Sequence, residues 1–66
     1  MSEKQFCELL KAAIIDEEKA VNEYLELHSI GQEIGLPKID EHGILHTAMD
    51  EQKHALFLKK LFKRCE

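Results

Sequence analysis

Two carboxylates and one imidazole stand at positions of this 66-residue chain where a helical pattern requires apolar side chains. Glu51 and His54 form a Glu-x-x-His motif in the middle of one apolar stripe, and Glu17 stands in the middle of another. An unpaired carboxylate is costly to bury, so three such groups need a compensating partner. A metal ion is the partner that carboxylate oxygens and an imidazole nitrogen bind together.

The first of the two helices that carry these groups is expected over residues 3–34. Ser2 followed by Gln5 is typical of a capping box at a helix start. Apolar side chains then recur at alternating steps of three and four, and Glu17 occupies the missing step. The apolar members are Phe6, Leu10, Ala13, Ala20, Tyr24 and Leu27.

The second helix is expected over residues 38–65, after a turn at about residues 35–37. Gly35 and Pro37 predict this turn, because glycine is enriched just past helix ends and proline at helix starts. Glu51 fills the gap in the second apolar series, and His54 lies one turn further on the flank of the same face. The apolar members are Ile44, Ala48, Ala55, Leu58 and Phe62.

These elements predict an all-α fold in which residues 1–66 form a single antiparallel helical hairpin. A lone hairpin leaves each apolar stripe half covered, so we expect two copies to dimerise into a four-helix bundle. The net charge of −4 argues against nucleic acid as a partner, and no apolar run approaches the ~18 residues of a membrane span. The first residues lack the layout of a signal peptide, which makes the cytoplasm the expected location.

The position of the turn places the three polar groups in one layer. Glu17 on one helix and Glu51 and His54 on the other are nearly equidistant from residues 35–37. That layer is at mid-height, where a two-fold pairing of hairpins superimposes it on its copy. A dimer would gather four carboxylates and two imidazoles, the set that holds two metal ions in di-iron carboxylate bundles. Two irons per dimer are therefore expected, and manganese suits the same ligands.

The residues around these groups resemble a known family. The segment 16–24, Asp-Glu-Glu-Lys-Ala-Val-Asn-Glu-Tyr, is similar to the first-helix ligand segment of rubrerythrins and other ferritin-like proteins. The segment 50–54, Asp-Glu-Gln-Lys-His, resembles their second-helix motif. Family members of full length carry four helices, so this chain looks like a half-length form of the encapsulated-ferritin type. The resemblance implies Glu17, Glu51 and His54 as iron ligands and Tyr24 as a residue beside the site.

The leading functional hypothesis is a homodimeric or larger di-iron protein that oxidises Fe²⁺ with O₂ or peroxide, for iron handling or peroxide detoxification. An electron-donor protein and an encapsulating shell are the partners that the resemblance implies. The alternative is a metal-binding or purely structural dimerisation module without turnover. Whether the chain is an enzyme of the ferroxidase or peroxidase type stays open at this point.

Other residues have simpler interpretations. Tyr24 is more readily explained as core filling than as a functional phenol, and His28 is too far along the helix from Glu17 to join its site. His42 and His46 are four residues apart and could bind an adventitious metal, but a solvated helix face is the favoured interpretation.

The two cysteines, Cys7 and Cys65, lie near opposite ends of the chain, which a hairpin brings together. A disulfide between them is geometrically conceivable, and two reduced thiols are the favoured interpretation for a cytosolic protein.

Overall fold

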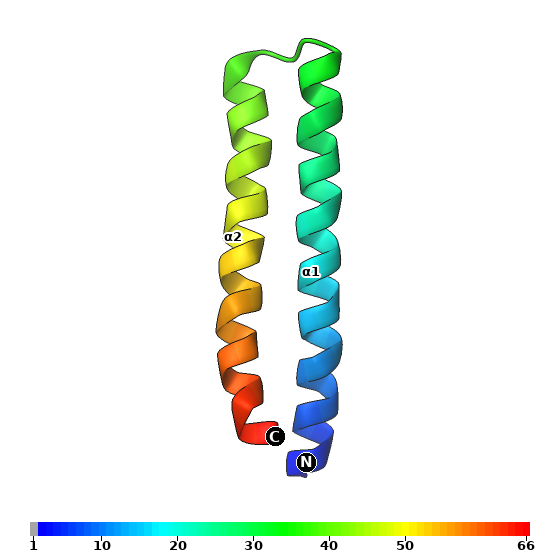
Figure 1. The fold of residues 1–66 in the computed structure, drawn as a ribbon, viewed down its shortest axis with the longest axis vertical. Coiled ribbons are helices and arrows are strands. Elements are labelled where there is room, and N and C mark those ends of the chain that lie inside the picture. Colours follow the sequence, from blue (N-terminus) through cyan, green and yellow to red (C-terminus); the bar gives the residue numbers. More distant parts are fainter. Residues whose placement is uncertain (1) are drawn as a thin grey trace.

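The computed structural model of the chain describes residues 2–66 as two long antiparallel helices (Figure 1). Helix α1 spans Glu3–Glu33, and helix α2 spans Lys38–Phe62 and continues into a short 3₁₀ turn, η1, at Lys63–Cys65. Both ends of the chain lie at the same end of a rod that measures 49 × 17 × 14 Å. The all-α hairpin predicted from the sequence is confirmed. Regular α-helix ends three residues earlier than the expected residue 65.

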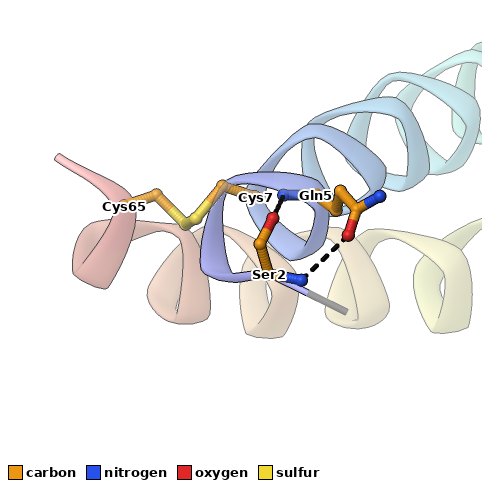
Figure 2. The surroundings of a disulfide bond; sticks show 4 residues. All are labelled: Ser2, Gln5, Cys7 and Cys65. Atoms are coloured by element: carbon orange, nitrogen blue, oxygen red, sulfur yellow. Dashed lines mark hydrogen bonds between the residues drawn. A yellow bond between two sulfur atoms is a disulfide. The ribbon is translucent and has the colours of Figure 1, made fainter.

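The start of α1 is fixed by the predicted capping box, which is confirmed. The backbone N–H of Gln5 donates to Ser2 Oγ at 3.1 Å, and the backbone N–H of Ser2 donates to Gln5 Oε1 at 2.8 Å (Figure 2). These two bonds satisfy backbone donors that a helix start otherwise leaves free.

The turn between the helices is a Schellman motif. The N–H of Leu36 donates to the carbonyl of Gly31 at 3.0 Å, and the N–H of Gly35 donates to that of Gln32 at 3.2 Å. Gly35 has a φ of 74°, in the left-handed region that glycine adopts without strain. The Leu36 side chain folds over Gly31, and a Cβ at residue 31 would stand 2.8 Å from Leu36 Cδ1. Gly35 is therefore required by the turn, whereas a Cβ at residue 31 would force the Leu36 side chain to move.

The hairpin core is sparse. Among residues 2–66, the buried apolar side chains are Leu10, Ile14, Ala48 and Ala55. Several of the larger apolar residues, including Leu9 and Phe57, keep more than 40% of their surface exposed. A chain this small with so little buried surface has marginal stability by itself. No described helix has the length together with the apolarity that a bilayer crossing demands.

The open end of the hairpin is closed by a disulfide, which corrects the interpretation of the cysteines as reduced thiols. Cys7 of α1 and Cys65 of η1 are bonded, with their Cα atoms 5.9 Å apart (Figure 2). The hairpin brings the two ends within the distance that a disulfide requires. The tighter turn of η1 carries Cys65 toward α1, which accounts for the early end of α2.

Candidate metal centre

Glu17, Glu51 and His54 lie together between the two helices. Each offers one ligand atom, and these atoms all lie within 4.8 Å of one another. His54 Nδ1 is 3.7 Å from Glu17 Oε2 and 3.8 Å from Glu51 Oε1. Among residues 2–66, no other group of three histidine, cysteine or acidic side chains is arranged in this way. The structure thus brings together all three side chains that the sequence singled out as ligands.

The helices position these groups through their registers. Residue 17 lies near the middle of Glu3–Glu33, and residue 51 near the middle of Lys38–Phe62. Residues three apart on a helix share a face, so Glu51 and His54 project toward the same point. The antiparallel turn sets Glu17 opposite them. The layer is therefore at mid-height of the hairpin.

The two carboxylates are mostly covered, whereas the imidazole is open. Exposed fractions of the side chains are 28% for Glu17, 25% for Glu51 and 61% for His54. Glu17 Oε2 is buried, and no described residue hydrogen-bonds to it. A buried carboxylate oxygen without a partner is costly, and a cation at this point would remove that cost.

The electrostatics of the layer show the same deficit of positive charge. The pKa of Glu17 is raised above its ordinary 4.5, first because its protonated form can hydrogen-bond the adjacent carboxyl group of Glu51, and then by burial and by the negative charge of Glu51. Asp16 adds to the rise, and the imidazole of His54 opposes it. Two carboxyl groups that share a site resist ionising together unless a cation joins them.

This donor set fits a hard or borderline divalent metal such as Fe²⁺ or Mn²⁺. Carboxylate oxygens come from Glu17 and Glu51, and the nitrogen is Nδ1 of His54, which faces both of them. Three ligands leave coordination positions unfilled, since these metals favour about six ligands. The open side of His54 shows where further ligands can arrive.

Apolar side chains lie further along that open side, toward the two ends of the hairpin. Glu17 and Glu51 face the opposite helix, and His54 is displaced from them toward one side of the hairpin. Leu9 and Leu27 are displaced the same way on α1; they are eighteen residues apart, about five full turns, and so lie on one line. Their exposed fractions are 60% and 51%. We define the metal face as Phe6, Leu9, Leu27, His54 and Leu61.

The opposite side of the hairpin carries an ion pair between the helices. Lys59 Nζ of α2 lies 2.9 Å from Glu18 Oε2 of α1, and both side chains are half-exposed. Glu18 follows Glu17 in the chain and lies on the other flank of α1. We define the back face as Glu18, Asn22, Gln52 and Lys59, residues that line a shallow hollow together with Val21, Ala55 and Leu56.

Three other sequence candidates lie outside the layer. Tyr24 is half-buried two turns along α1 from Glu17, at a position consistent with core filling. His42 and His46 are exposed on α2, and neither belongs to the metal-ligand group.

A second polar cluster near the turn was only half anticipated. The sequence marked His28 as structural but gave no role to its partner, Glu41, which is 9% exposed. Gln32 Nε2 donates to Glu41 Oε1 at 2.8 Å, and His28 Nε2 lies 3.3 Å from the same oxygen. Residue 28 lies five residues before the last residue of α1 and residue 41 lies three residues after the first residue of α2, so both are near the turn, which is the signal that would have paired them. We call these three residues the turn cluster.

Comparison with known proteins places this geometry in a family. The sequence model of rubrerythrin matches residues 8–66, which is nearly the whole chain and includes all three residues of the metal-ligand group. Searches of curated proteins and of solved structures each find no match. Rubrerythrins generally bind iron, and a carboxylate–histidine group is present here. The chain belongs to the rubrerythrin family.

Proposed function

We propose that two copies of this chain pair through the metal face, hold two iron ions between them, and oxidise Fe²⁺ with O₂ or peroxide. The observation that carries the proposal is the buried Oε2 of Glu17, which has no hydrogen-bond partner among the described residues. It lies beside a second carboxylate and an open imidazole, in a chain whose family binds iron.

Pairing of two chains is supported by the incompleteness of the site. One hairpin offers three ligand atoms, whereas two hairpins offer four carboxylates and two imidazoles. An axis that crosses the helices at mid-height brings the layer of Glu17 and Glu51 onto its copy and moves every other layer away from its own copy. The exposed leucines of the metal face would be covered by the same contact, which favours association.

Charge balance supports two metal ions per dimer. Four carboxylates offset the charge of two divalent cations, and a glutamate that bridges them can hold the metals a few Å apart. Manganese would bind the same ligands, so loading with iron depends on supply as well as on the site.

Bound iron would supply the redox chemistry. The residues of this chain would hold the metals. A bound cation would lower the pKa of Glu17 again, because it would offset the repulsion from Glu51 that contributes to raising it. The apolar side chains of the metal face would exclude bulk water from the assembled site. Repeated peroxide reduction would draw electrons from a separate donor protein, and a protein shell is a further partner of this proposal.

Anaerobic titration with Fe²⁺ followed by admission of O₂ tests the function. We expect one Fe²⁺ bound per chain, then loss of Fe²⁺ faster than in buffer and a visible absorption band of the oxidised centre. Stoichiometric binding without faster oxidation would favour a metal-binding module without turnover. If the chain does not bind one Fe²⁺ per chain, both the oxidase and the metal-binding module are contradicted.

A further inference from the structure

The disulfide at the open end of the hairpin has the surroundings of an exchange site. We propose that Cys7–Cys65 is a reversible thiol–disulfide clamp, opened by small thiols and closed again by their disulfides. The bond joins the first turns of α1 to η1, the last three residues before Glu66 (Figure 2). Both cysteines are half-buried rather than enclosed in a core.

An open hollow of ≈ 440 Å³ borders the bond and provides room for an incoming thiol. Phe62 supplies an apolar wall, and both cysteines belong to the lining. Three cationic side chains surround the hollow: Lys4, Lys11 and Arg64. Two carboxylates, Glu3 and Glu8, also line it and temper the positive charge.

The exchange chemistry is complete with two thiol molecules. A thiolate attacks one sulfur of the bond, forms a mixed disulfide and expels the other cysteine as a thiolate, which nearby cations stabilise. A second thiolate attacks the outer sulfur of the mixed disulfide and frees the remaining cysteine. The products are two protein thiols and one small-molecule disulfide, so the two electrons come from the two thiols.

The clamp is on the side of the hairpin away from the metal face. Cys7 lies eleven residues before Glu18, about three full turns, so the two share the flank of α1 that belongs to the back face. The hollow would therefore stay accessible in the dimer proposed above. Only the accessibility of the hollow in the dimer rests on the proposed function.

Little else holds the two chain ends together. Phe6 is exposed, and the first buried core residue, Leu10, is one turn further into α1. Reduction should therefore release η1 and the last turn of α2. The metal ligands lie ten to fourteen residues from the cysteine on the same side of the turn, about 15–21 Å along the helices, so the layer should keep its geometry.

The test uses the full metal-free chain. We expect glutathione to reduce the folded protein within roughly tenfold of the rate for the urea-unfolded protein, as for an exposed disulfide. Glutathione disulfide should restore the intramolecular bond. Reduction should speed amide hydrogen exchange of residues 60–65 by roughly tenfold or more, and leave exchange around residue 51 within about threefold. A folded chain that resists reduction until it unfolds would overturn the proposal.

The double variant C7S/C65S is the matched control. It should show fast exchange at residues 60–65 with or without glutathione, equal to that of the reduced natural chain. If glutathione changes exchange in this variant, or reduction of the natural chain leaves its ends protected, the clamp does not exist. Fe²⁺ binding is read separately, so its absence would contradict the proposed function and leave the clamp intact.

Discussion

The hairpin has two polar clusters built from similar residues, and they differ in how well their charges are matched. In the turn cluster, Glu41 is almost fully buried and its Oε1 has an amide donor at 2.8 Å and an imidazole nitrogen at 3.3 Å. In the mid-height layer, two carboxylates share one imidazole at 3.7 and 3.8 Å, and Glu17 Oε2 has no hydrogen-bond partner among the described residues.

The difference distinguishes a polar cluster that stabilises the fold from one that is suited to bind a ligand. A buried carboxylate with its partners in place fixes the register of the two helices, while one without partners stays costly until a ligand arrives. Residue type alone does not distinguish the clusters, since each contains histidine and glutamate. The ratio of carboxylates to neighbouring nitrogen groups distinguishes them.

The largest contrast is expected in metal affinity. Replacing Glu51→Ala removes a ligand and should weaken Fe²⁺ or Mn²⁺ binding by more than about 100-fold, since loss of an outer-shell partner alone costs 10–100-fold. Glu41→Ala in the turn cluster is the matched control and should change affinity by less than about threefold. Isothermal titration under anaerobic conditions measures both. Similar losses in the two variants would erase the distinction between the clusters.

In stability, by contrast, the larger effect is expected from the control variant in the turn cluster. Glu41→Ala leaves the amide of Gln32 without its acceptor and the buried Nε2 of His28 without a neighbouring carboxylate, and should destabilise the metal-free chain by about 1–3 kcal/mol. For a domain of this size each kcal/mol lowers the melting temperature by about 4–8 °C. Thermal unfolding followed by circular dichroism reads the effect. An unchanged melting temperature would show that the turn cluster contributes nothing to the fold.

A smaller effect is expected from pH, and its sign is specific to the metal-free layer. The pKa of Glu17 is raised above 4.5 in the folded chain, so folding favours its protonated form. This contribution is fully present below 4.5 and is lost as the pH rises through the raised pKa. The melting temperature of the metal-free protein should therefore fall as the pH rises through the pKa of Glu17. The Glu17→Gln variant should lack this part of the fall. Melting temperatures of the natural chain and the variant, measured over the same pH range, isolate the effect of Glu17. The same pH dependence in both proteins would contradict the assignment of this effect to Glu17.

The smallest effect belongs to the back face. Lys59→Gln breaks a half-exposed ion pair with Glu18 and should cost about 0.2–0.5 kcal/mol, as surface pairs do. Metal affinity and mass in solution should stay unchanged, because this face is turned away from the layer. A change in metal affinity would show that the back face takes part in the metal site, and a change in mass in solution would show that it takes part in the dimer contact. Either result would contradict the assignment of both to the metal face.

Much of this arrangement is predictable from the sequence. The periodic apolar residues and the turn chemistry of Gly35 predict two antiparallel helices, and equal distance from the turn predicts that Glu17 meets Glu51. The Ser2 and Gln5 capping box follows from spacing alone. These features are local or depend on one register, which the turn determines.

The features that escaped prediction depend on a particular packing environment. Glu41 looks like an ordinary first-turn acid, and only the position of Gln32 on the facing helix makes it a buried acceptor. The bond between Cys7 and Cys65 depends on the 3₁₀ turn at the chain end, whereas an expected cytosolic location favoured free thiols.

Native mass spectrometry of the iron-loaded protein, prepared without oxygen, tests the central claim most directly, because it reads chains and metals in one particle. The account predicts a species of two chains with two iron ions, and loss of its iron in the Glu51→Ala variant. A single chain that holds iron by itself, or a dimer that forms without binding any, would contradict a site shared between two copies.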